Sequence, residues 1–355
     1  MGASKFSVIG FLASEIGLGQ AARNVANAIK SQNIPINLVN IYLEGRSNAT
    51  EFYKECEAYE PGNTNILISG IDGIHGLDSQ LKQMGSGSKN YLYLFWELDK
   101  IPSSKLSELN SFDEVIAPTS FIANAVSRAL EREISTIPLP VPIPENYEPN
   151  RIRDGVLRIY ASMDFDSWVS RKNPQGVLDA FNAAFPKSFD DVRLIVKVRG
   201  ENDGGFRDAL ESYRLNDHRI HIIDYTLPRD EIDVLINDCN VYLSMHRSEG
   251  FGLGPAEALV REKIVVSTNY SGTVDFINSQ TGFPVDFRLR ALEPQEYCYW
   301  ENQSWAEPVI ESAASALREI YENFDRALER AKFGRMLMLR NHSYGAAGRA
   351  FRSLL

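Results

Sequence analysis

Cysteine and long apolar runs are both scarce in this chain of 355 residues. Its three cysteines, Cys56, Cys239 and Cys298, lie far apart, and no two have the spacing of a metal-ligand or redox pair. Such cysteine usage is typical of a reducing compartment. No uninterrupted apolar stretch reaches the ~18 residues of a membrane span, and the first residues lack the layout of a signal peptide. We therefore expect a cytoplasmic protein.

Positive charge is also limited, with 37 basic against 47 acidic residues and a net charge of −10. This balance argues against nucleic acid as a partner. The C-terminal segment is a local exception, and its helix either packs on the body with a solvated face or makes peripheral contact with the inner face of a membrane. Its basic residues are Arg326, Arg330, Lys332, Arg335, Arg340, Arg349 and Arg352.

Apolar runs of strand length alternate with amphipathic stretches of helical length through most of the chain. This alternation is typical of parallel sheets with crossover helices, and it predicts an α/β fold. The expected strands are 5–12, 35–41, 65–70, 91–96, 113–117 and 134–138 in the first half, and 157–162, 192–198, 219–223, 240–244 and 263–267 in the second.

A proline-rich segment separates the two series of strands. Residues 137–149 hold five prolines, which fix φ and remove backbone donors, so this segment cannot form a central strand or a helix interior. It reads as an extended linker. We predict a first domain over 1–150, a second over 151–330, and a helix over 331–355 that packs back on the first domain.

The stretch 244–259 contains most of the residues that point to a function. Glu249 and Glu257 bracket a loop with glycines at 250, 252 and 254, between an expected strand and a helix that Pro255 helps to start. Backbone amides at such a helix start favour an anion such as a diphosphate, and a carboxylate accepts hydrogen bonds from paired sugar hydroxyls. Helix-start glutamates and capping glycines would explain each residue singly, but not the whole set.

This stretch resembles the signature of glycosyltransferase family 4, the retaining family with the GT-B architecture. Further motifs carry the likeness: Arg171-Lys172-Asn-Pro174 resembles the basic pair of the second domain, and 268–275 resembles the second glycine motif. In the first half, 17–23 and 95–98 look like a bacterial polysaccharide-type subgroup. The resemblance implies two Rossmann-like domains whose parallel sheets face each other across a cleft.

The resemblance also implies roles for matching residues. Glu257 would bind the ribose hydroxyls of the nucleotide, Glu249 the hydroxyls of the transferred sugar, and Lys172 the leaving phosphate. Many relatives have an arginine six positions before that lysine, where this chain has Asp166, so Arg171 and Arg199 are candidate replacements. Sugar and diphosphate would meet the backbone of Gly250, Phe251, Gly252, Leu253 and Gly254, and the nucleotide base would meet the loop around Tyr225 and Thr226.

Gly17 and Gly19 open a helix after the first strand, so we count them as candidate donor-binding residues. The segment 17–22 is nearly a dinucleotide fingerprint, which makes a Rossmann-type dehydrogenase an alternative. That fingerprint expects an acidic residue near the end of the second strand, and Asn40 stands there.

Three further side chains are candidates on position alone. His246, just before Glu249, would donate to a phosphate or sugar hydroxyl, or it is a satisfied loop histidine. His75 and Glu97 would orient the acceptor hydroxyl, or they are structural. Asp164-Phe-Asp166 has the spacing of a divalent-metal site, but we favour loop-capping carboxylates and predict no metal.

These observations predict a retaining glycosyltransferase that moves a sugar from a uridine- or guanosine-linked nucleotide diphosphate sugar to a hydroxyl. The acceptor would be a glycan or a lipid-linked oligosaccharide in cell-surface polysaccharide synthesis, and no cofactor is required. A GT-B protein that binds nucleotide or glycan without transferring sugar remains the main alternative.

Overall fold

The computed structural model describes residues 6–43, 63–74, 88–145, 147–201 and 204–354. Within them the chain forms two compact units. One unit contains the residues up to Pro142 together with those from Arg340 onward, and the other contains Ile143–Leu339. The sequence predicted division at 150 and 330; the contacts divide the chain inside the proline-rich segment and again near the end of the last long helix.

The first unit is built on a six-stranded parallel sheet in the order β2-β1-β3-β4-β5-β6. Its strands are short, and β1, β3, β4 and β5 are mainly buried, which suits parallel strands covered by helices on both faces. The elements are β1 (Phe6–Gly10), α1 (Gly17–Lys30), β2 (Ile36–Asn40), β3 (Thr64–Gly70), η2 (Ile71–Gly73), β4 (Lys89–Phe95), η4 (Ser103–Lys105), α3 (Leu106–Leu109), β5 (Glu114–Ala117), α4 (Ser120–Leu130), β6 (Ser135–Thr136) and α12 (Tyr344–Arg352).

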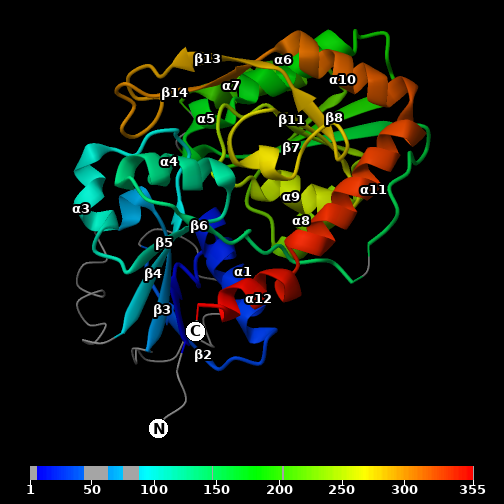
Figure 1. The fold of residues 1–355 in the computed structure, drawn as a ribbon. Coiled ribbons are helices and arrows are strands. Elements are labelled where there is room, and N and C mark those ends of the chain that lie inside the picture. The colour runs from blue at the N-terminus through cyan, green and yellow to red at the C-terminus, as the bar shows by residue number, and fades with distance from the viewer. Residues whose placement is uncertain (1–5, 44–62, 75–87, 146, 202–203, 355) are drawn as a thin grey trace. The chain divides into compact units, whose positions relative to one another are not determined.

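The second unit has a six-stranded parallel sheet in the order β12-β11-β10-β7-β8-β9, with a separate hairpin of β13 and β14. Figure 1 shows α6 and α10 on one face of this sheet and α8 and α9 on the other. The elements are β7 (Leu157–Asp164), η5 (Phe165–Ser167), α5 (Val169–Lys172), α6 (Pro174–Ala184), β8 (Val192–Arg199), α7 (Phe206–Asn216), β9 (Ile220–Asp224), α8 (Arg229–Asp238), β10 (Val241–Ser244), α9 (Leu253–Val260), β11 (Ile264–Thr268), η6 (Ser271–Asp275), β12 (Phe283–Val285), β13 (Phe287–Ala291), β14 (Ser304–Pro308), α10 (Ile310–Glu322) and α11 (Phe324–Asn341).

The core of the second unit follows the period of two that a strand imposes. Alternate residues of β7 and β8 face one side, where they pack against α6 and α10. Residues of the opposite parity, among them Tyr160, Ser162 and Tyr242, face α9. The predicted α/β class with two Rossmann-like sheets is confirmed.

The proline-rich segment forms no helix or strand over its described residues. Ile137, Leu139 and Val141 are nevertheless buried. The backbone N–H of Val141 donates to the carbonyl of His342 at 2.8 Å. The first part of the predicted linker is therefore packed structure.

The predicted single helix over 331–355 is corrected by the structure to the end of α11 and a separate helix, α12. Ser343 ends the continuity, because its extended backbone and its hydroxyl, which accepts from the Ala346 N–H, cap the start of α12. α12 lies against α1 in the first unit (Figure 1). The approach is close at Gly348, where an added Cβ would lie 2.2 Å from the Ala28 carbonyl oxygen.

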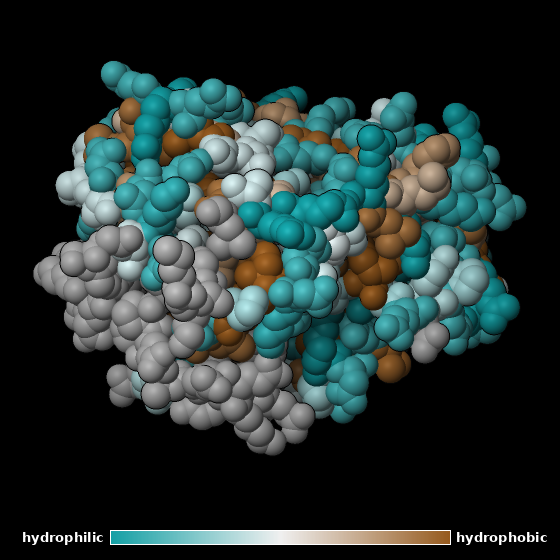
Figure 2. All heavy atoms as spheres, turned by 60° about the horizontal axis from the view of Figure 1, so that its bottom comes forward, coloured by the Kyte–Doolittle hydropathy of each residue, from teal (hydrophilic) through white to brown (hydrophobic). Residues whose placement is uncertain are grey.

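No helix in the described residues is long and apolar enough to cross a membrane. On the face shown in Figure 2, hydrophobic residues form small patches among hydrophilic ones. Part of the basic charge near the C-terminus is engaged within its own unit, since Arg330 pairs with Glu319 at 2.9 Å and Arg335 lies over the Tyr147 ring.

The two glycines at the start of α1 provide a test of packing. An alanine Cβ at Gly19 would lie 2.2 Å from the Ser14 carbonyl oxygen, whereas Gly17 has open space. We expect Gly19→Ala to lower the free energy of unfolding by about 1–3 kcal/mol, and Gly17→Ala to change it by less than about 0.5 kcal/mol. Urea titration followed by circular dichroism measures both, and equal effects would contradict the packing role of Gly19.

Candidate active site

The strand order of the second unit creates one topological switch point. β7 and β10 are neighbours, but the chain continues from β7 toward β8 and from β10 toward β11, on opposite sides. Ligands of open α/β sheets bind at the carboxyl ends of strands at such a point. The segment after β7 supplies Arg171 and Lys172, and the segment after β10 supplies Glu249.

These three side chains form an ion cluster in which Arg171 and Glu249 are buried and Lys172 is partly exposed. Arg171 Nη1 lies 2.9 Å from Glu249 Oε2, and Lys172 Nζ lies 2.5 Å from Glu249 Oε1. Arg171 also donates to the carbonyls of Ser248 and Ser167. The structure brings together these three residues, which the sequence analysis assigned to one site, and of the two candidate replacement cations Arg171 is the one in the cluster.

Charge, rather than exposure, keeps Glu249 ionised. Burial favours the neutral acid and acts to raise its pKa, but Lys172 and Arg171 outweigh burial and hold the pKa well below its usual range. One carboxylate facing two cations leaves an excess of one positive charge in the cluster. This excess suits a ligand that is itself an anion.

A second loop fixes the backbone of Glu249. Its N–H donates to Ser271 Oγ at 2.8 Å, and its carbonyl accepts from the Gly272 N–H at 2.8 Å. Gly272 has no room for a side chain, because an added Cβ would lie 2.1 Å from the Gly250 carbonyl oxygen. The second glycine motif noted in the sequence thus holds the first one in place.

The start of α9 offers donors for an anion. The N–H groups of Leu253 and Gly254 have no acceptor in the part of the chain that the structure describes, and Pro255 follows with no N–H at all. Free amides at a helix N-terminus are a ready site for phosphate.

The glycines of this loop also have reasons that involve no ligand. Gly252 has φ of +94° at the N-cap of α9, a conformation that L side chains rarely adopt. At Gly254 an added Cβ would lie 2.1 Å from Tyr242 Oη. Phe251 is buried with its ring against Phe276, so its side chain serves the core and only its backbone can serve a ligand.

Glu257 lies one turn into α9 and is buried except for 6% of its surface. Its Oε1 lies 2.8 Å from Arg229 Nη1, at the start of α8. Burial lowers the pKa of Arg229, but the carboxylates of Glu257 and Asp233 outweigh it and raise that pKa above its ordinary value. Sequence reasoning missed Arg229, because nothing in its local pattern marks it as a partner of α9.

His246 is enclosed rather than presented to solvent. Its Nδ1 lies 3.0 Å from Ser244 Oγ, and its Nε2 lies 3.4 Å from the Tyr270 carbonyl oxygen. Burial lowers its pKa to about 4, although Glu249 opposes the shift. A neutral imidazole that is 1% exposed supports the loop geometry and is not placed to meet a ligand directly.

The edge beyond β7 and β8 holds the remaining second-unit candidates. Arg199 pairs with Asp164 at 2.6 Å, at the adjoining ends of the two strands, so its charge is matched there and not by Glu249. Asp164 also accepts from the Asp166 N–H, and Asp166 accepts from the Glu201 N–H. Both carboxylates cap their loops. Tyr225 and Thr226 are exposed in the loop after β9.

The described residues contain no group of three or more histidine, cysteine, aspartate or glutamate side chains placed to hold a metal ion.

The remaining candidates belong to the first unit, whereas the ion cluster belongs to the second. Gly17 and Gly19 begin α1, and Glu97 follows β4 and is half-buried. His75 lies outside the described residues. Asn40 does not take the place of a ribose-binding acid: its Oδ1 accepts from the Ala13 N–H at 2.8 Å and fastens the loop before α1.

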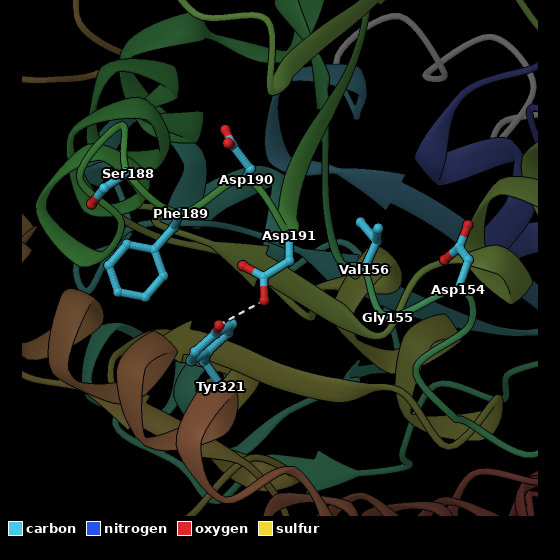
Figure 3. Close-up of a pocket in the computed structure, with 8 residues that line it drawn as sticks. All are labelled: Asp154, Gly155, Val156, Ser188, Phe189, Asp190, Asp191 and Tyr321. Carbon is cyan, nitrogen blue, oxygen red and sulfur yellow. Dashed lines mark hydrogen bonds between the residues drawn. The ribbon is translucent and has the colours of Figure 1, made fainter.

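A hollow of about 630 Å³ lies at the other end of the second sheet. Figure 3 shows its lining residues, with Tyr321 donating to Asp191 at 2.7 Å. Val156 and Asp191 directly precede β7 and β8, so the hollow lies at the amino ends of the strands. This is the end opposite to the one where α/β sheets bind ligands, and the ion cluster is absent from it.

Comparison with known proteins gives a family for the segment that contains the ion cluster. Residues 166–291 match the family model described as Glycosyl transferases group 1, which spans the ion cluster and both glycine loops but less than half of the chain. The uncharacterized glycosyltransferase YqgM of Bacillus subtilis is 24% identical over 217 residues, or 61% of this chain and 56% of the relative. The chain thus spans little more than half the length of that relative.

Solved structures share the fold at low identity. A glycosyltransferase from Rickettsia africae has a TM-score of 0.72 at 16% identity, covering 100% of this chain and 98% of the other. Anabaena HepE, solved with UDP and glucose, has a TM-score of 0.66 at 12% identity over 99% of each chain. The fold is that of GT-B glycosyltransferases, and the family match and the curated relative support that family.

The burial of His246 has a consequence for stability. An unfolded histidine titrates near 6.5, so below this pH the unfolded chain binds more protons than the folded one. We expect the free energy of unfolding to fall by about 3 kcal/mol from this source between pH 6.5 and pH 4. Urea titrations at several pH values measure the slope. His246→Gln should flatten it, and a change at the exposed His218, His218→Gln, should not; an unchanged slope in His246→Gln contradicts the enclosure.

Proposed function

We propose that this chain is a retaining glycosyltransferase that moves a sugar from a nucleotide diphosphate sugar to a hydroxyl of a glycan or lipid-linked oligosaccharide. The observation that carries the proposal is the Glu249–Arg171–Lys172 cluster, which adjoins the free amides of α9 at the switch point. The reaction class in this proposal is supported by the family model and the curated relative, which are both glycosyltransferases.

The proposed donor spans the loop, with its sugar at Glu249 and its ribose at Glu257. In this proposal the diphosphate meets the amides of Leu253 and Gly254, with Lys172 and Arg171 supplying positive charge. Glu249 accepts hydrogen bonds from the transferred sugar, and Glu257 accepts them from the ribose. The nucleoside of the donor is uridine or guanosine, and HepE, which has this fold, was solved with UDP. No metal or other cofactor takes part.

The reaction needs charge stabilisation more than a protein nucleophile. The bond between the anomeric carbon and the β-phosphate oxygen breaks, and the acceptor oxygen forms a bond to the same face of that carbon. The acceptor proton passes to the leaving phosphate. Negative charge grows on that phosphate as the bond breaks, and Lys172 and the helix amides stabilise it.

Glu249→Gln should remove the charge that orients both cations while keeping the side chain's volume. We expect transfer and donor hydrolysis to fall at least about 100-fold, in line with the loss of one preorganised group in a site of this kind, with Glu211→Gln on the exposed face of α7 as control. Donors are first chosen by thermal shift with uridine and guanosine diphosphate sugars, with and without a chelator.

Nuclear magnetic resonance of the product, or of released sugar, then reads the anomeric configuration. Retention supports the proposal, and inversion overturns the retaining mechanism. Full activity in Glu249→Gln would remove the cluster from the chemistry.

Glu257→Gln tests the nucleotide end separately. A hydrogen bond to a charged acceptor contributes about 1.5–3 kcal/mol, so we expect the Kd of the nucleoside diphosphate to rise about 10- to 100-fold. The 2′,3′-dideoxy form of the same nucleotide has no ribose hydroxyls and should bind wild type and variant alike. Calorimetry measures both, and an equal loss for the two nucleotides would contradict the ribose role.

A binding protein without transferase activity is the second candidate. It is favoured by one observation: Asp166 occupies the position of the expected arginine and caps a loop, so the cluster has only two cations. Measurable turnover of a nucleotide sugar excludes this candidate, and nucleotide binding without turnover supports it. A nicotinamide-dependent absorbance change would instead favour a dehydrogenase.

A further inference from the structure

An exposed tryptophan adjoins the ion cluster. Trp168 directly precedes α5, whose last two residues are Arg171 and Lys172, and its carbonyl accepts from the backbone N–H of both. Its side chain is 40% exposed, whereas Arg171 is 3% exposed. A large aromatic surface therefore lies open within one helical turn of the cluster.

The backbone of Trp168 is strained. Its φ is +64° and its ψ is 94°, a combination that a bulky L residue rarely adopts. Such conformations cost on the order of 1–3 kcal/mol, persist only where the surroundings impose them, and gather at binding sites. Trp168 is therefore a bulky residue held in an unfavourable backbone conformation with 40% of its surface exposed.

The indole rests on a second aromatic ring. The centroids of Trp168 and Tyr297 are 5.3 Å apart with an interplanar angle of 49°. Tyr297 is buried and lies edge-on to Trp305, which is fully buried. Arg290 lies over the Trp305 ring at 5.4 Å. The exposed ring is thus backed by a packed aromatic stack.

The hairpin of β13 and β14 carries this stack, and Arg247 fastens it to the active-site segments. Arg247 Nε lies 2.7 Å from Glu307 Oε2 on β14, and its Nη1 donates to the Ser170 carbonyl on α5. Its backbone bridges the same two parts, because its N–H donates to Arg171 and its carbonyl accepts from Ala306. Figure 1 shows the hairpin beside α5. β14 and the loop before it lie beyond residues 166–291, so this part of the stack is an addition to the segment that the family model matches.

We propose that Trp168, supported by Tyr297, is a stacking surface for a pyranose ring of the acceptor, an inference that rests on the proposed function. A pyranose presents a face of C–H bonds that packs on an aromatic ring, while its hydroxyls remain free for polar partners. Trp168 belongs to the segment that carries Arg171 and Lys172, the two partners of Glu249, whereas Glu257 and Arg229 belong to α9 and α8, so we assign a sugar ring and not the nucleobase to the indole. Glu249 is buried and serves the transferred sugar, so the exposed indole meets the ring outside it.

Tryptophan fluorescence tests the proposal without any turnover. The full chain is saturated with uridine or guanosine diphosphate and titrated with methyl glucopyranoside, methyl galactopyranoside and methyl N-acetylglucosaminide. At least one should change the emission of wild type. Trp168→Ala should abolish that change and weaken binding by calorimetry about tenfold, whereas Trp168→Phe, which keeps an aromatic face, should bind within about threefold of wild type. Trp300→Phe, at a partly exposed tryptophan of the hairpin loop, is the matched control.

The outcomes are distinct. Binding that persists with a non-hydrolysable nucleotide sugar in place supports an acceptor ring; competition with that sugar assigns Trp168 to the transferred sugar and overturns the proposal. No response to any pyranoside up to about 50 mM, or equal responses in folded Trp168→Ala, also overturns it. Pyranoside binding without nucleotide-sugar turnover would count against the proposed function and leave the stacking surface standing.

Discussion

The loops at the switch point of the second unit depend on one interaction, the pairing of Glu249 with Arg171 and Lys172. It joins the segment after β7 to the segment after β10, the two neighbouring strands of the switch point. Breaking a buried ion pair by removal of one partner typically costs about 3–5 kcal/mol, because the other charge stays buried without compensation. We therefore expect the loop, the two cations and the start of α9 to keep one arrangement whether or not a ligand is bound.

Neighbouring residues hold the backbone of Glu249 and the side chain of Glu257 in place. Ser271 and Gly272 fix the backbone of Glu249. The enclosed, neutral His246 contacts Ser244 and the Tyr270 carbonyl beside this loop. Arg229 holds Glu257 at the other end of the loop. Carboxylates thus stand at both ends of the loop, with the amides of Leu253 and Gly254 between them in sequence. Preorganisation of this kind is how a site stabilises charge that develops only during reaction.

The strands and the loop of the candidate site were predictable from sequence, because hydrophobic periodicity and the positions of glycine and proline are local features. Alternating apolar runs placed the strands, and Glu249, Glu257 and the glycines between them marked the loop. Arg229 and Trp168 were not predictable as site residues, since their roles arise from elements that meet only after folding. The same holds for the glycines, because Gly19 and Gly254 are needed for contacts with Ser14 and Tyr242 that no local pattern shows. The single helix predicted over 331–355 was wrong because Ser343 caps the start of a separate helix, α12.

A crystal structure of the chain with uridine or guanosine diphosphate bound tests the central claim most directly. The account predicts the diphosphate at the amides of Leu253 and Gly254, beside Lys172, with ribose hydroxyls on Glu257. Density for the nucleotide in the hollow lined by Asp191 and Tyr321, or only at the start of α1, would contradict it.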